Sequence, residues 1–490
     1  METFKNQSKN QITFISFLRQ RTQFIELTIL SSFYIIVYIL TLKAYPYPDV
    51  TPDSGTYILS AKRMLISGYR PFGYSWFLNY IHEISNGVNL LFFSQYLLNA
   101  LASLFFLFTI KYFFPPVKGI VFILLALFLV LEPHTLYLTR MIMSDTLFTT
   151  MTILFLTSLF WINQNNKLLV NIVLLVFHLL VLYATFNIRY TALFYPAISI
   201  IYFVGVLKNK ILGICIGFLA VFVVAFSYNK TKNEMKEHYS VYTFSGFGGW
   251  VLANNAVSVL PYIDLNPKEF THGDLRFIHS KLITYPDSFY HKKHIINTSF
   301  IWLNDFPGKK VFYQLQKSNN MSYVQGWNYT GDRMKKYAKT LIKKYPIKYF
   351  RHFILVNMKQ LFKYFEIPKQ ASYKPDDLQK EWFDLKIENH IFKTQAFFAM
   401  NPLLKCIHFI RWILLFISIL LLSLKFRTIK FNSSQKKILV ALFTFLLLFL
   451  GFSVIASPVN NFRYLTPSYI YMLSLIYIIT NQYLLKRKKL

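Results

Sequence analysis

The sequence predicts an all-α protein that crosses a membrane about ten times. Of its 490 residues, 54% are hydrophobic and 19% are aromatic, which is more apolar surface than a soluble domain usually buries. The mean hydropathy of +0.37 agrees. Ten apolar windows have the length of about 17–25 residues that a helix needs to cross the hydrocarbon core. They lie at 24–43, 88–110, 117–133, 142–162, 168–186, 191–207, 211–229, 404–424, 438–456 and 466–485.

Basic residues indicate which side of the membrane is cytoplasmic, because cytoplasmic loops are enriched in Lys and Arg. With ten spans, the basic loops all fall on one side together with both termini, and we expect that side to be the cytoplasm. A bias towards Lys, Asn, Ile and Phe is typical of a low-GC bacterium, which predicts the bacterial inner membrane. The residues concerned are Lys5, Lys9, Arg19, Arg21, Lys111, Lys118, Lys167, Lys208, Lys210, Lys425, Arg427, Lys430, Lys436, Lys437 and Lys486 to Lys489.

The net charge of +32 would suggest a nucleic-acid partner in a soluble protein. Here the cytoplasmic loops explain part of it, and attraction to anionic lipid headgroups explains more. We therefore expect membrane lipids, and no nucleic acid, among the partners. The two cysteines, Cys215 and Cys406, both lie in apolar stretches, so no disulfide framework is predicted.

The first loop on the outer side, 44–87, is predicted to hold two amphipathic helices on the membrane surface. The first begins at Asp53 or Ser54, and Gly68 suits the position just after its end. The second is expected after Pro71 and Gly73. Asp53 is a favoured N-cap residue, and on the residues alone this structural role is preferred over a catalytic one. Asp49 likewise suits a turn between prolines.

Three further outer segments bring an arginine to the end of a span: Arg140, Arg189 and Arg463. One arginine there is most simply an interfacial anchor, but three on the side that disfavours basic residues favour a function. Asp145 lies near the outer end of a span, where an ionisable residue is a functional hypothesis by default; its alternatives are a pair with Arg140 or a helix cap. Tyr464 fits either a phosphate contact or the interfacial aromatic belt.

A large outer insert, 230–403, separates the seventh span from the eighth. It contains 26 Lys and Arg against 14 Asp and Glu, and its net charge of +12 suggests an anionic partner. The stretch 331–365 predicts two basic amphipathic helices broken before Pro346. Two interpretations stay open: helices in the lipid headgroup plane, or the charged outer face of a packed domain. We therefore divide the chain into 1–229, 230–403 and 404–490.

Two other features of the insert resemble known sites but do not match them. The glycine-rich stretch 246–256 lacks the Lys-Ser/Thr of a phosphate-binding loop, and we expect a turn and a short apolar helix on the acceptor side. Four histidines match no common zinc spacing, so no metal site is predicted. They are His272, His279, His291 and His294.

Several segments together resemble the GT-C superfamily of integral membrane glycosyltransferases. The similarity is greater to the bacterial branch related to protein O-mannosyltransferases and the lipid A aminoarabinose transferase. It rests on "PDSGTYILSAKRMLISGYRPFGYSWFL" in the first outer loop, "EPHTLYLTRMIMSDTLF", "FNIRYTALFYP" and "NNFRYLTPSYIYML". It covers most of 24–229 and 404–485. The chain has Asp-Ser where many members carry Asp-Glu or Asp-Asp, which leaves metal use and the identity of the base open.

The resemblance implies an enzyme that moves a sugar from a polyprenyl-phosphate donor to a lipid, glycan or protein acceptor at the outer face, usually with inversion. Under it, Asp53 is the general base, and Arg189 and Arg463, with Tyr464 and Arg140, bind the donor phosphate. The insert recognises the acceptor. No cofactor is assigned, and a divalent cation stays open. Supporting roles fall to Asp49, Tyr57, His134 and Asp145.

Two other classes of function stay open. A lipid-linked sugar flippase or transporter fits ten spans with charges at the outer face, but the two halves of the chain show no repeat. A polyprenyl-linked glycan polymerase or ligase handles similar lipids through large outer loops. Such an enzyme is expected to carry its arginines in that loop, whereas here they lie at the ends of spans.

Overall fold

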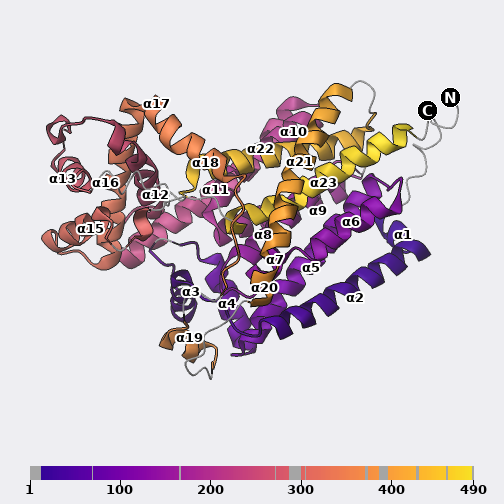
Figure 1. Ribbon diagram of the computed structural model, residues 1–490, viewed down its shortest axis with the longest axis horizontal. Coiled ribbons are helices and arrows are strands. Elements are labelled where there is room, and N and C mark those ends of the chain that lie inside the picture. Colours follow the sequence, from indigo (N-terminus) through magenta and orange to yellow (C-terminus); the bar gives the residue numbers. More distant parts are fainter. Residues whose placement is uncertain are drawn as a thin grey trace.

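The computed structural model describes residues 13–68, 70–164, 167–270, 272–285, 300–303, 305–369, 374–385, 395–425, 430–458 and 462–487. Within these ranges the chain is helical, and the one β-type pairing is an isolated bridge between Asp49 and Met141. A bundle of long helices carries the insert at one end, and the first described helix, α1 (Phe14–Leu18), and the C-terminal end of α23 (Phe462–Arg487) lie at the opposite end (Figure 1). We call these ends the insert side and the termini side.

All ten apolar windows form helices, which confirms the predicted all-α membrane fold. Seven helices in the described chain are long and apolar enough to cross a membrane, counting α6 and α7 as one, and two shorter apolar helices accompany them. The ten are α2 (Arg21–Ala44), α5 (Val88–Phe113), α6 (Gly119–Val130) with α7 (Pro133–Thr139), α8 (Asp145–Trp161), α9 (Leu168–Ile188), α10 (Tyr195–Val206), α11 (Lys210–Tyr239), α21 (Asn401–Lys425), α22 (Ser433–Ala456) and α23 (Phe462–Arg487).

Two of the predicted spans end later than the hydropathy pattern indicates. The third continues through α7 to Thr139, because the polar residues that end the window, Glu132 and His134, are buried inside the bundle. The seventh continues as α11 to Tyr239, well beyond residue 229. Helix α23 is long but is not among the seven, and it buries Ser468, Ser474 and other polar side chains against its neighbours. Polar side chains that are buried inside the bundle thus make a span look shorter in the hydropathy pattern than it is in the structure.

The first loop forms the two expected helices, α3 (Pro52–Arg63) and α4 (Gly73–Ile84). The predicted ends of α3 are wrong. Its N-cap is Thr51, whose backbone N–H donates to Ser54 Oγ at 3.0 Å, so Asp53 does not cap the helix. The helix stops at Arg63, where Met64 and not Gly68 takes the left-handed conformation (φ 49°). Gly68 instead packs against the insert, since a Cβ there would lie 2.3 Å from Val324 Cγ1.

The insert has a hydrophobic core of its own. Its central contact joins α12 (Phe247–Ala256) to α16 (Tyr323–Lys344), with α13 (Gly273–Leu282) and α15 (Pro307–Ser318) alongside. The glycine-rich stretch is the start of α12, as expected, and its glycines allow close approach of the two helices. A Cβ on Gly249 would lie 1.9 Å from the carbonyl oxygen of Gly331. The glycines therefore serve packing.

The two basic helices predicted from 331–365 do break before Pro346. The first belongs to α16, and its apolar side is buried in the insert core through Met334, Tyr337 and Leu341. For α16 the packed-domain interpretation is therefore correct. The second continues as α17 (Pro346–Tyr349), a π-helical turn (Phe350–Ile354) and α18 (Leu355–Gln360), which run from the insert towards the bundle (Figure 1).

Helix α19 (Asp377–Trp382), at the C-terminal end of the insert, packs on the first loop. It contacts α3, where Lys62 pairs with Glu381 at 3.0 Å, and the Trp382 ring stacks on His82 of α4 at 3.8 Å. Next, α20 (Gln395–Ala399) places Phe397 against Tyr45, at the end of the first span. The insert thus contacts the loop that carries Asp53.

Candidate functional site

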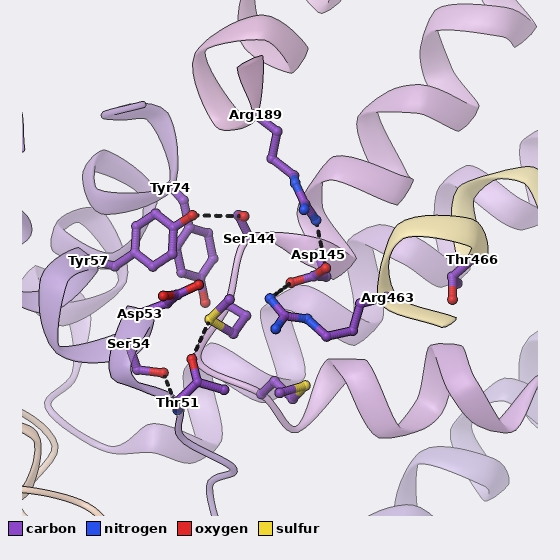
Figure 2. Close-up of polar contacts among 12 residues, drawn as sticks. Thr51, Asp53, Ser54, Tyr57, Tyr74, Ser144, Asp145, Arg189, Arg463 and Thr466 are labelled. Atoms are coloured by element: carbon purple, nitrogen blue, oxygen red, sulfur yellow. Dashed lines mark hydrogen bonds and ion pairs between the residues drawn. The ribbon is translucent and has the colours of Figure 1, made fainter. Parts of the chain in front are cut away.

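A buried carboxylate joins two arginines at the insert side of the bundle. Asp145, the first residue of α8, is 1% exposed. Its Oδ1 accepts from Arg189 Nη1 at 2.6 Å and its Oδ2 from Arg463 Nη2 at 3.2 Å. Figure 2 shows the two guanidinium groups reaching this carboxylate from different helices. Arg189 follows the last residue of α9, and Arg463 is the second residue of α23. Two of the three predicted arginines therefore meet, and Asp145 pairs with these two rather than with Arg140, the alternative partner predicted from the sequence.

An aromatic ring and a small cavity complete this cluster. The Tyr464 ring lies 5.3 Å from the Arg189 guanidinium carbon and 6.0 Å from that of Arg463, within the range of cation–π attraction. A cavity of about 20 Å³ adjoins both arginines, room for little more than one water molecule. Guanidinium groups and Tyr464 form one wall. The other walls are largely apolar and include Phe148, Phe194, Phe449, Phe452 and Pro467.

Asp53 lies on the other side of the same site (Figure 2). Its side chain is 31% exposed and forms an ion pair with Arg70, and it is close enough to Arg463 to act on it electrostatically. Because Thr51 caps α3, the Asp53 carboxylate is not needed by the helix start and is directed at charged partners. A partly exposed carboxylate beside a cationic cluster is placed to accept a proton from a bound hydroxyl group.

The first loop is fixed to the bundle by its tyrosines. The Tyr57 hydroxyl lies 3.1 Å from Ser144 Oγ, next to Asp145 in the chain. The Tyr74 hydroxyl donates to Gln95 of α5 at 2.9 Å, and the two tyrosine rings meet edge to face at 4.9 Å. These contacts hold α3, and with it Asp53, against the start of α8. Tyr57 thus connects the first loop to the start of α8, and its supporting role in the reaction stays a prediction.

Asp49 is buried behind this site and is not available to substrate as it stands. Its backbone pairs with the 140–142 segment, with Asp49 N–H donating to the Arg140 oxygen at 2.9 Å. Its carboxylate accepts from the Tyr137 hydroxyl. Burial raises the pKa of Asp49 to about 6, against the opposing effects of the Tyr137 hydrogen bond and the Arg463 charge. Asp49 thus fixes the loop to the bundle.

Arg140 has other neighbours than the two clustered arginines. It is 1% exposed, and its guanidinium carbon lies 3.9 Å from the centre of the Phe92 ring on α5. None of its guanidinium nitrogens has a hydrogen-bond partner among the described residues. Burial lowers the pKa of Arg140 to about 10. Its contribution to phosphate binding stays a prediction, because its side chain contacts the Phe92 ring rather than the Asp145 cluster.

A second buried charged group, deeper in the bundle, was not predicted as a unit. Glu132 Oε1 lies 3.0 Å from His134 Nδ1, and Glu132 Oε2 lies 3.6 Å from Arg411 Nη1 on α21. Arg411 is 2% exposed, and its guanidinium carbon lies 3.5 Å from the Tyr469 ring. Glu132 and Tyr469 also line a second small cavity. His134 belongs to this group and not to the Asp145 cluster.

Only some of the four histidines of the insert lie in the part of the chain that the structure describes. His279 is buried and its ring nitrogens lie 2.8 Å from the Tyr337 hydroxyl and the Leu265 carbonyl, so hydrogen bonding within the insert core accounts for it. His291 and His294 lie outside the described residues. Within the described ranges, no three His, Cys, Asp or Glu side chains come together as a metal site would require.

Sequence reasoning missed Arg70 and Arg411. Arg411 lies inside an apolar span, and a charge there is itself a signal of function that was available from the sequence. Arg70 gave no such signal. It lies in the link between α3 and α4, and only the fold brings it to Asp53. Of the predicted residues, Arg189, Arg463 and Tyr464 lie at the Asp145 cluster, and Asp49, Asp53 and Tyr57 lie in the loop packed on it. Arg140 and His134 have other partners, Phe92 and Glu132.

No protein-family model matches this chain, and no curated protein matches it. Among solved structures, the chain is similar to ArnT from Cupriavidus metallidurans bound to undecaprenyl phosphate. The two are 10% identical, the alignment covers 89% of this chain and 78% of that chain, and the TM-score is 0.33. A TM-score this low does not establish a shared fold, and we therefore infer the function of this chain from its own side chains.

Proposed function

We propose that this chain is a membrane glycosyltransferase. It moves a sugar from a polyprenyl-phosphate donor to a lipid, glycan or protein acceptor at the outer face of a bacterial inner membrane, with both termini in the cytoplasm. The observation that carries the proposal is the meeting of Arg189 and Arg463 beside a cavity with largely apolar walls, with Asp53 facing the same site. Such a site offers cations for a phosphate, phenylalanines for an isoprenoid chain, and a carboxylate for a hydroxyl.

The two arginines bind the donor phosphate in this scheme. A guanidinium group has five N–H donors, and the contacts with Asp145 use one nitrogen of each group. Arg463 Nε, which is buried, has no hydrogen-bond partner among the described residues, so a donor remains for an incoming phosphate. Asp145 keeps both cations in place when no phosphate is bound. The cavity is too small for a phosphate group, so its walls must separate to admit the donor.

Asp53 acts as the general base. Its carboxylate takes the proton from the acceptor hydroxyl, the acceptor oxygen bonds to the anomeric carbon of the sugar, and the bond from that carbon to the phosphate oxygen breaks. The leaving phosphate keeps the electron pair, and Arg189 and Arg463 stabilise its charge. Attack opposite the leaving group inverts the configuration at the anomeric carbon. The ion pair with Arg70 holds the direction of the Asp53 carboxylate.

Deletion of the protein tests this function. Mass spectrometry should show one glycan or lipid modification missing from the envelope and one polyprenyl-phosphate sugar accumulating. If the protein were a flippase, the deletion strain would instead keep the lipid-linked sugar in the cytoplasmic leaflet. Membrane vesicles of known orientation, prepared from that strain, would show the sugar lipid on that side. An unchanged pool of lipid-linked sugars would be evidence against both.

A further inference from the structure

The helical run from Pro346 to Gln360 links the core of the insert to the core of the bundle. At its start, Tyr349 and Phe353 belong to the insert's own hydrophobic cluster. Just after its end, Leu361 and Tyr364 belong to the cluster of the bundle. One continuous stretch of chain therefore leaves the insert and enters the bundle before the chain returns to the first loop.

The run reaches well below the insert-side end of the bundle. Asn357 Nδ2 donates to the Val454 and Ser457 carbonyls at 3.0 and 2.7 Å, at the end of α22. Further on, the Phe362 ring lies 4.7 Å from that of Trp412. Trp412 is eleven residues along α21 from Asn401, so it lies about 16 Å from that end at 1.5 Å per residue. Because Asn401 and the exposed Lys405 precede the apolar part of α21, this distance corresponds to a depth of less than half of a 30 Å hydrocarbon core.

The outer side of this run is apolar and exposed. Ile347 is 76% exposed, Phe350 53%, Met358 44% and Phe362 37%, and their spacing places them along one face. Large exposed apolar surface of this kind marks a contact with a partner or a membrane. Phe362 also lies 6.0 Å from Phe416 of α21, which is itself 53% exposed among other apolar residues of that span. We call Ile347, Phe350, Met358 and Phe362 the apolar stripe, and it is thus continuous with the apolar surface of α21 that faces lipid.

Basic residues accompany the stripe. Residues 346–363 contain four Lys and Arg and no Asp or Glu. Arg351 and Lys359 are exposed and each follows a stripe residue directly. Long basic side chains beside an apolar face can reach towards lipid phosphates while their stems cover apolar surface. This combination favours a membrane with anionic headgroups over water or a neutral protein surface.

We propose that residues 346–363 form a re-entrant segment that inserts into the outer leaflet and contacts anionic phospholipid. The apolar stripe lies among acyl chains, and Arg351 and Lys359 contact lipid phosphates. After Gln360 the chain turns back, and Asn401 holds this turn by accepting from Ile367 N–H and donating to the Ile367 carbonyl, both at 2.9 Å. Irregular chain at this depth is tolerated because it is packed on protein. The proposal does not depend on the enzymatic activity.

Single cysteines test the segment in the full-length protein. Cys215 and Cys406 are first replaced by serine, and one cysteine is then introduced as Phe350→Cys or Met358→Cys. Tyr313→Cys is the matched control, since Tyr313 is an aromatic residue of α15 that is 60% exposed. In phosphatidylcholine–phosphatidylglycerol vesicles, a membrane-impermeant maleimide should label both test sites at least tenfold more slowly than the control.

A second measurement tests the lipid headgroup. A bimane label on Phe350→Cys, attached before reconstitution, should be quenched at least twofold more by brominated phosphatidylglycerol than by brominated phosphatidylcholine. Arg351→Gln with Lys359→Gln should remove that preference. Equal quenching by the two lipids overturns the contact with anionic lipid. Labelling of both test sites at the control's rate overturns the insertion itself. Protection from the maleimide that appears only at high protein density also overturns it, because it indicates that a second copy of the protein covers the segment.

Discussion

Asp145 is the carboxylate that both Arg189 and Arg463 contact, so Asp145→Asn removes the negative charge that the two arginines share in the proposed donor site. The side chains of Arg189 and Arg463 are only 14% and 19% exposed and would lose the carboxylate that pairs with both of them. Breaking one buried ion pair costs about 3–5 kcal/mol, because an uncompensated charge stays buried. We expect Asp145→Asn to lower the free energy of unfolding by about that amount. Equilibrium unfolding in mixed micelles, followed by tryptophan fluorescence, measures it.

Donor phosphate should partly reverse this loss. A polyprenyl phosphate supplies the negative charge that Asp145→Asn removes, so it should stabilise the variant more than the wild type. At 100 times its Kd a ligand adds about 2.7 kcal/mol to the stability of the state that binds it. Asp332→Asn is the matched control, because Asp332 pairs on the surface at 48% exposure and should cost no more than about 1 kcal/mol. Equal stabilisation of variant and wild type would refute the shared role of these groups.

Two further outcomes concern Asp49 and Arg463. The pKa of Asp49 is about 6 in the folded protein and lower when unfolded, so its protonated form stabilises the fold below about pH 4, and this contribution is lost as pH rises through 6. The unfolding free energy of the wild type relative to Asp49→Asn should therefore fall by about 3 kcal/mol between pH 3 and pH 7; a constant difference would contradict this. Arg463→Lys loses the guanidinium fork and should weaken polyprenyl-phosphate binding about tenfold or more, measured by native mass spectrometry. The same change at the exposed Arg63 should leave the affinity unchanged, and equal affinities for both variants would argue against a phosphate contact.

The sequence predicted the helical membrane fold because hydropathy reports which segments are apolar enough to leave water. It predicted the ends of α3 wrongly because several local signals compete there. Thr51 and Asp53 are both good N-caps, and the backbone pairing of Asp49 with the 140–142 segment, which no local pattern reveals, fixes the chain just before the helix. Gly68 suited a helix end, but contact with Val324 of the insert explains it better.

The sequence predicted which residues belong to the candidate site better than it predicted which of them pair with one another. Arginines at the ends of spans were recognisable from the positive-inside rule, and Arg189 and Arg463 do meet. That they meet on Asp145 depends on the packing of three helices whose contributing residues are 44 and 318 positions apart along the chain. The separation of Arg140 from this cluster depends on the same packing, and so does the pairing of Glu132 with Arg411.

The proposed role of Asp53 is tested most directly by complementation. A strain lacking the protein is supplied with the wild type, Asp53→Asn or the surface control Asp332→Asn, and its lipid-linked sugars and envelope glycans are measured by mass spectrometry. The wild type and Asp332→Asn should restore the missing modification and clear the accumulated polyprenyl-phosphate sugar. Asp53→Asn, present in the membrane at the same level, should do neither. Restoration by Asp53→Asn would contradict the assignment of this carboxylate as the base.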